Sequence, residues 1–167
     1  MIPVNLLFAL KAEVEDAVKD YKMAAENQDD KKVTVYAQHI PDENFQEDTY
    51  YPLIIVSLQK VKDSLENEPE ASIATVGFTF GVHGFEPEAW RDLLNLMEHV
   101  RQRLLTRRTI ANAYRLVLPI EWETIEAQPY PFWFGYGTVT YTIAQPQEGF
   151  PVEFDAVMEE YTNEQEG

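Results

Sequence analysis

The strongest structural signal in the chain is a change of hydrophobic period on either side of Gly84. Before this glycine, large apolar residues occupy alternate positions, which predicts a half-buried strand. After it, the apolar spacing changes to three and four residues, and Pro87 suits the first turn of a helix. The alternating residues are Val76, Phe78, Phe80 and Val82. The stripe that the helix from about Pro87 to Leu105 is expected to bury consists of Trp90, Leu93, Leu94, Met97, Val100 and Leu104.

Periodicity predicts the remaining elements as well. Helical spacing of Leu7, Leu10 and Val14 predicts an amphipathic helix over about residues 4–25. Alternation predicts strands over residues 33–37, 52–60, 114–122 and 132–144. We therefore expect an α+β fold, with an N-terminal helix and a central amphipathic helix packed on a mainly antiparallel sheet of four to five strands. A core position in that helix predicts that Leu94→Ala lowers the free energy of unfolding by about 2–5 kcal/mol.

Length and charge narrow the class of protein. The chain has 167 residues, which favours one domain, expected over residues 1–150 and followed by an acidic, mobile tail over 151–167. There is no cysteine, so neither a thiolate nucleophile nor a disulfide framework is available. The 29 acidic and 13 basic residues give a net charge of −16, which opposes tight binding to nucleic acid or anionic lipid.

The sequence carries no targeting or membrane signal that we can identify. Residues 1–10 lack the positively charged n-region of a signal peptide, and Lys11 interrupts the apolar run. We therefore expect the protein to be intracellular when it is synthesised. The uncharged stretch from Ala127 to Gln147 contains three prolines and is too polar to span a membrane.

Catalytic and metal-binding patterns are weak. The three histidines, His39, His83 and His99, lack HExxH spacing, and no phosphate-binding loop or GxSxG elbow is present. His83 with Glu86 is compatible with part of a metal site, but a histidine facing solvent beside a turn is the simpler interpretation. An acidic loop is compatible with calcium but lacks the EF-hand pattern; its carboxylates are Asp42, Glu43, Glu47 and Asp48. We expect no enzyme activity, no cofactor and no metal.

Arginines gather at the end of the central helix. Every lysine precedes Asp63 and every arginine follows Trp90, so the only dense positive segment is formed by Arg101, Arg103, Arg107 and Arg108. One interpretation is a solvated helix end that satisfies the helix dipole. The other is an anchor for an acidic surface, either of a partner or of a second copy of the chain.

Aromatic residues are densest in QPYPFWFG, from Gln128 to Gly135. Alternation sends Phe132 and Trp133 to opposite faces of the sheet, so one large ring needs cover beyond a one-sided core. The aromatic candidates for an interface are Tyr130, Trp133 and Tyr136. An alternative is a small-molecule pocket, or a small enzyme, floored by Trp122, Trp133 and Tyr136. Gly135 and Gly137 are candidate bulge positions.

Three segments together resemble a known family. They are YPLIIV at Tyr51–Val56, GVHGFEPEAWRDLLNLMEHVRQRLL at Gly81–Leu105, and LVLPIEWETIEAQPYPFWFGYGTVTYTI at Leu116–Ile143. Their order and spacing resemble the tail terminator proteins (tail completion, or head-tail joining) of long-tailed phages and prophages. The resemblance implies a small α/β domain that assembles as a hexameric ring on the tail tube. It also implies contacts with the tail-tube protein and the head-tail connector, and no catalytic residues.

The same resemblance implies a protein of the host cytoplasm during assembly and of the virion tail afterwards. Another phage neck or connector component is the alternative with the same fold. In a ring, the arginine segment of one subunit is expected to face acidic loops of the next, at residues 42–48 and 66–70. An acidic channel would also avoid holding DNA phosphates.

Overall fold

The computed structural model describes residues 3–24, 31–40, 48–65 and 71–146, so the expected acidic tail lies outside the described residues. The helices are α1 (Pro3–Val18), the 3-10 turn η1 (Asp48–Tyr50) and α2 (Ala89–Thr106). The strands are β1 (Thr34–Ala37), β2 (Leu53–Asp63), β3 (Ser72–His83), β4 (Thr109–Ile110), β5 (Tyr114–Thr124) and β6 (Phe132–Thr142). No helix in these ranges is long and apolar enough to cross a membrane.

The six strands form one sheet in the order β1-β2-β3-β6-β5-β4. The pair β1–β2 is parallel and the other pairs are antiparallel. The α+β class is therefore confirmed. The strand expected over residues 33–37 is β1, and the expected count of four to five strands is too low because the two-residue β4 extends the sheet beyond β5.

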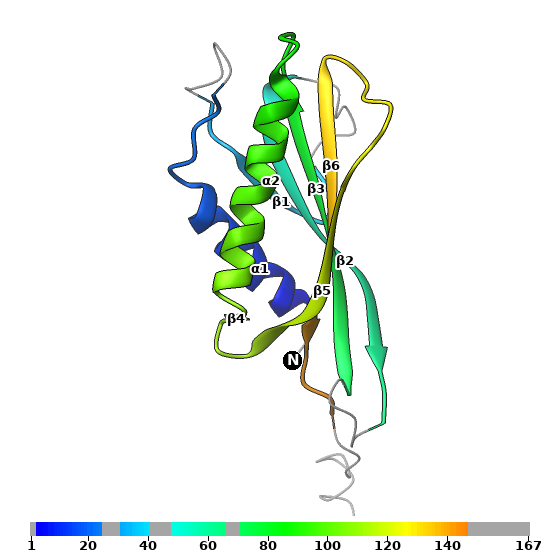
Figure 1. The fold of residues 1–167 in the computed structure, drawn as a ribbon. Coiled ribbons are helices and arrows are strands. Elements are labelled where there is room, and N and C mark those ends of the chain that lie inside the picture. The colour runs from blue at the N-terminus through cyan, green and yellow to red at the C-terminus, as the bar shows by residue number, and fades with distance from the viewer. Residues whose placement is uncertain (1–2, 25–30, 41–47, 66–70, 147–167) are drawn as a thin grey trace, which may run out of the picture.

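Both helices pack on the same face of the sheet, and no described helix covers the other face (Figure 1). On β3 the alternation is as the sequence predicts, since Val76, Phe78, Phe80 and Val82 are all buried beneath the helices. The opposite, helix-free face carries the side chains of Thr75 and Thr79 from the same strand. One half of the apolar core is thus contributed by the sheet and the other by α1 and α2.

Two element boundaries differ from the sequence prediction. Helix α1 ends at Val18 rather than near residue 25, and the backbone N–H of Ala24 then donates to the Asp92 carboxylate on α2 at 2.8 Å. This bond connects residues 68 positions apart, so local periodicity could not reveal it. Strand β2 continues to Asp63, into a stretch expected to be loop, and its hairpin with β3 extends past the helices (Figure 1).

The buried stripe of α2 was predicted wrongly at two positions. Trp90 is 42% exposed and Leu94 is 44% exposed, whereas Leu96 is fully buried. Leu93, Met97, Val100 and Leu104 are buried, as expected. The error has a geometric cause, because the apolar residues of α2 span an arc wider than the sheet can cover. One flank of that arc therefore remains at the surface.

The two glycines of β6 are not bulges. Gly135 pairs regularly with Phe80, and Gly137 pairs regularly with Phe78. Register shifts occur instead in β5, between Val117 and Glu121, and in β2, between Leu58 and Lys60. Each glycine leaves room for a large side chain that crosses it, namely Met97 at Gly135 and Trp122 at Gly137.

Candidate functional site

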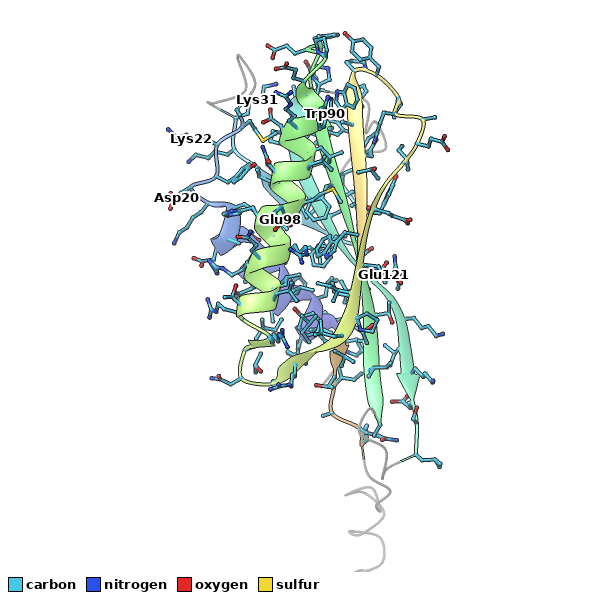
Figure 2. All side chains as sticks on the ribbon, viewed as in Figure 1. Asp20, Lys22, Lys31, Trp90, Glu98 and Glu121 are labelled. Carbon is cyan, nitrogen blue, oxygen red and sulfur yellow. The ribbon has the colours of Figure 1, made fainter. Side chains whose placement is uncertain are left out.

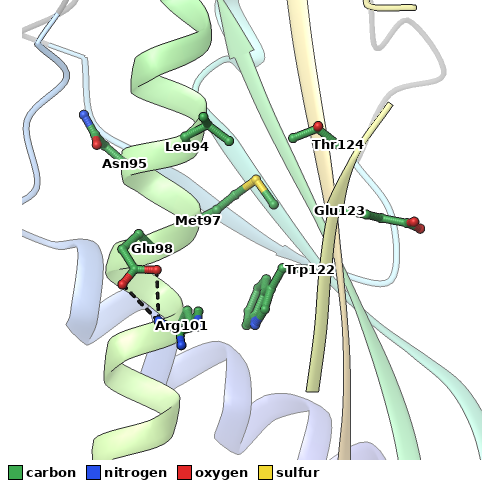
Figure 3. A pocket seen from close by; sticks show the side chains of 8 residues that line it. All are labelled: Leu94, Asn95, Met97, Glu98, Arg101, Trp122, Glu123 and Thr124. Atoms are coloured by element: carbon green, nitrogen blue, oxygen red, sulfur yellow. Dashed lines mark hydrogen bonds and ion pairs between the residues drawn. The ribbon is translucent and has the colours of Figure 1, made fainter. Parts of the chain in front are cut away.

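A groove of about 480 Å³ lies between α2 and β5 (Figure 3). Met97 reaches into it from the helix, and Trp122 lies across it from the strand. The Trp122 ring packs on the rings of Phe78 and Phe80, with centroid distances of 5.9 and 5.7 Å. The lining residues are Leu94, Asn95, Met97, Glu98, Arg101, Trp122, Glu123 and Thr124.

The rim of the groove is charged. Arg101 Nη1 donates to Glu98 Oε1 at 3.0 Å, and Gln102 donates to the same oxygen at 3.0 Å. The hydrogen bond from Gln102, together with the Arg101 charge, holds the pKa of Glu98 below its ordinary range. Glu123 lies on the strand side of the groove. The site thus combines an apolar floor with an ionised rim.

An exposed apolar strip on α2 is formed by Trp90 (Figure 2) and by Leu94, which borders the groove (Figure 3). The Arg91 guanidinium lies 5.4 Å from the centroid of the Trp90 ring. Leu94 itself lines the groove. Two large apolar side chains one helical turn apart, exposed beside a groove, are typical of a protein-binding surface. The sequence analysis missed this surface because it assigned both residues to the core.

Three of the predicted aromatic residues occupy separate places. Tyr130 is exposed, and its hydroxyl donates to the Phe85 carbonyl at 2.7 Å. Trp133 is half-buried, and its indole N–H donates to the Gly84 carbonyl at 3.1 Å. Tyr136 lies on the helix-free face, while Trp122 and Trp133 lie on the helix-covered face. The expected pocket floored by Trp122, Trp133 and Tyr136 is therefore not formed.

The arginine segment is partly used within the chain. Arg103 donates to Asp16 Oδ2 at 2.8 Å and to Glu13 Oε1 at 3.1 Å, so it joins α2 to α1. Arg107 lies 3.3 Å from the same Glu13 oxygen, and Arg108 Nε donates to the Leu105 carbonyl at 3.1 Å. Most of the acidic loops expected to face these arginines in a ring, at residues 42–47 and 66–70, lie outside the described residues.

These contacts change one expectation for mutants. A solvated helix end would make these arginines exposed charges, each contributing only about 0.3–1 kcal/mol to the free energy of unfolding. Glu13 is only 11% exposed, so a carboxylate at position 107 would face a largely desolvated carboxylate. Reversal of Arg107 therefore disturbs the contact between α1 and α2, and it cannot report on assembly alone.

The histidines do not form a metal site among the described residues, where no three carboxylate or imidazole groups converge suitably. His99 Nε2 lies 2.6 Å from the Ala17 carbonyl of α1, which makes it part of the helix packing. His83 is buried between the rings of Phe85 and Phe132, each 5.0 Å away, and its Nδ1 has no hydrogen-bond partner among the described residues. Burial lowers the pKa of His83, although Asp48 opposes the shift.

This environment predicts a pH dependence of stability. The unfolded chain binds the His83 proton more readily than the folded chain, so the free energy of unfolding falls as the pH drops below about 6.5. His83→Phe and His83→Gln are each expected to remove that contribution, which gives a shallower loss between pH 7.5 and 5.5. Urea unfolding at several pH values measures the slopes, and equal slopes in wild type and both variants would contradict the assignment.

The groove and the exposed strip are thus the candidate site, and they combine apolar contact area with a polar and charged rim. No model of a known protein family matches the chain, and no curated protein matches its sequence.

Proposed function

We propose that this chain is a structural assembly protein that caps the tail tube of a long-tailed phage as a ring and joins the tail to the head. The observation that carries the proposal is the exposure of Trp90 and Leu94 beside the α2–β5 groove. Apolar side chains of this size, aligned along one helix and rimmed by charge, suit contact with another protein. The segment resemblance to tail terminators supplies the identity of the assembly.

The chemistry of the groove supports a role without turnover. The charged side chains that face it are those of Glu98 and Arg101, which form an ion pair, whereas the Glu123 side chain points away from the groove (Figure 3). A catalytic site needs a nucleophile or base in a defined relation to a second polar group. In the described part of the groove, the Glu98 carboxylate and the Arg101 guanidinium lie on the rim, and the floor is apolar.

Charge supports the remaining parts of the proposal. A net charge of −16 per chain disfavours binding of DNA phosphates. Weak binding is what a ring needs if DNA is to pass through it. The same charge makes copies repel one another, so assembly needs apolar contact and specific ion pairs. The partners are further copies of the chain, the tail-tube protein and the head-tail connector. The sites of action are the host cytoplasm during assembly and the virion tail.

The test is deletion of the gene in the phage or prophage that carries it, with complementation by wild type and variants. Electron microscopy reads the distribution of tail lengths and the fraction of joined particles. Wild type should restore tails of uniform length, and Leu94→Glu should not, although circular dichroism shows it folded. Phe8→Glu is the matched control, because Phe8 is an exposed apolar residue of α1 outside the groove. Normal joined virions from the deletion strain would overturn the proposal.

A small-molecule-binding domain is a second candidate, favoured by one observation. The indole N–H of Trp122 is buried and has no hydrogen-bond partner in the described part of the chain, and it lies beside a groove within the usual size range of ligand sites. Screening of a metabolite collection by NMR, following the Trp122 indole proton, tests it. A shifted indole resonance that Leu94→Glu abolishes would favour this function over assembly.

A further inference from the structure

The sheet has two unpaired edges at opposite sides. On one side, β4 pairs only with Tyr114 and Arg115 of β5, so residues 117–124 of β5 have no described strand on their outer side. On the other side, β1 pairs with β2 only as far as Val56, and residues 59–63 of β2 have no described strand on the side away from β3. Those residues belong to the hairpin that extends beyond the helices (Figure 1). Unpaired strand edges favour pairing with another strand.

The β2 edge is basic and the β5 edge is acidic. Lys60 and Lys62 are exposed and two residues apart, so they share one face of β2. Glu121 and Glu123 are exposed and two residues apart on β5. Among the described residues none of these four side chains takes part in an ion pair. Each edge thus carries two like charges without a counterion.

The sheet register places all four charges on the helix-free face. Lys60 pairs with Thr75, which pairs with Thr140 of β6, while Glu121 pairs with Thr138 of the same strand. Thr138 and Thr140 are two residues apart and therefore share a face. Figure 2 shows Glu121 on the side of β5 away from the helices. Between the charges, Val61 and Trp122 point to the opposite, helix-covered face.

We propose that the β2 edge of one copy pairs with the β5 edge of the next copy as an antiparallel ladder, with Val61 opposite Trp122. This register places Lys60 against Glu123 and Lys62 against Glu121. The antiparallel sense follows from the sheet, because β5 runs opposite to β2. The proposal deepens the proposed function, on which it rests, by naming the contact between copies. Because the two surfaces differ, the contact is head-to-tail and can close a ring.

The register also fixes an offset between copies. Val61 is level with Tyr141 of β6, and Trp122 is level with Gly137, four residues away along that strand. Four residues correspond to about 13 Å along a strand, and the four strands from β2 to β5 span about 19 Å across the sheet. For the copies to close into a ring rather than a helix, the strands must be inclined by about 35° to the ring axis. Closed β-sheets adopt such a tilt.

Disulfide trapping tests the contact directly, because the chain has no cysteine of its own. The variant Lys62→Cys with Glu121→Cys places two thiols opposite each other across the proposed ladder, at a separation that a disulfide spans. Oxidation of the full chain should give a ladder of covalent dimers, trimers and larger species. Lys22→Cys with Glu121→Cys is the control, because Lys22 is exposed and follows α1, away from β2. A yield of covalent dimers and larger species no higher than that of the control would overturn the proposal.

Charge reversal gives an independent measurement. Lys60→Glu with Lys62→Glu makes both edges acidic, and Glu121→Lys with Glu123→Lys makes both edges basic. Each double variant alone should associate at least tenfold more weakly than wild type in sedimentation, and an equimolar mixture should recover, since every junction then joins opposite charges. The control variant Lys22→Glu with Lys32→Glu changes the net charge by the same amount as Lys60→Glu with Lys62→Glu, but at positions away from the edge. It should associate like the wild type. A mixture that does not recover would contradict the paired edges.

The phage assay separates this inference from the proposed function. If oxidation gives covalent oligomers but deletion of the gene leaves the tails normal, the contact between copies is supported and the tail-capping role is contradicted. If the double-cysteine variant rescues the deletion strain but forms no covalent oligomers on oxidation, the tail-capping role is supported and the contact is contradicted.

Discussion

Leu96→Ala is expected to lower the free energy of unfolding by about 2–5 kcal/mol, whereas Leu94→Ala should lower it by about 0.5 kcal/mol or less. The two leucines lie on the same helix, but Leu96 is fully buried and Leu94 is 44% exposed. Truncation of Leu96 removes apolar contacts and leaves a cavity between helix and sheet. Truncation of Leu94 removes only a side chain that already contacts solvent.

Urea denaturation followed by circular dichroism measures both free energies, and the pair controls for helix propensity because the substitution is identical. Equal losses for the two variants would show that α2 is rotated about its axis relative to this description. A large loss for Leu94 alone would restore the stripe inferred from periodicity.

Gly137→Ala should be the most damaging single-methyl change in the sheet, with a loss of about 1–3 kcal/mol from overpacking. A Cβ at residue 137 would lie 2.5 Å from Cζ3 of the Trp122 ring, which is itself packed on Phe78 and Phe80. The rigid indole can move only by displacing those rings. We therefore expect a lower stability together with a changed Trp122 environment.

Gly135→Ala is the matched comparison, because its Cβ would overlap the sulfur of Met97. A thioether end has rotatable bonds and can turn aside, so the expected loss is smaller than at Gly137. Thermal and urea unfolding of both variants, with tryptophan fluorescence, provides the test. A Gly135→Ala variant less stable than Gly137→Ala would contradict the view that stiffness of the neighbour decides the cost.

Local patterns in the sequence predicted much of the fold. Period-two alternation located β3 and β6, and the period change after Gly84 located α2. The inward face of α2 was not settled by these patterns, because Trp90 and Leu94 follow helical spacing as well as Leu93 and Met97 do. What decides between such faces is the shape of the sheet beneath, and that shape depends on residues far away in the chain.

The candidate site depended on such distant relations. The α2–β5 groove exists because Met97 crosses Gly135 and Trp122 crosses Gly137, and sequence alone suggested bulges at both glycines. Arg103 could be assigned to a positive segment, but its partners Glu13 and Asp16 lie 90 and 87 residues away. Only the folded chain shows that this arginine joins two helices.

The uneven covering of the sheet has a mechanical consequence for a ring of the proposed kind. Copies joined through β2 and β5 would place the bulky helices on the wider, outer circumference, so the helix-free face would line the opening. The described residues at the centre of that face include Thr75, Thr79, Thr138 and Thr140, together with Tyr136. Uncharged hydroxyls form only brief hydrogen bonds with passing phosphates, and each lysine near them would be cancelled by a glutamate. Such a wall would bind DNA only weakly as it passes, and the threonines would thereby add to the effect of the net negative charge.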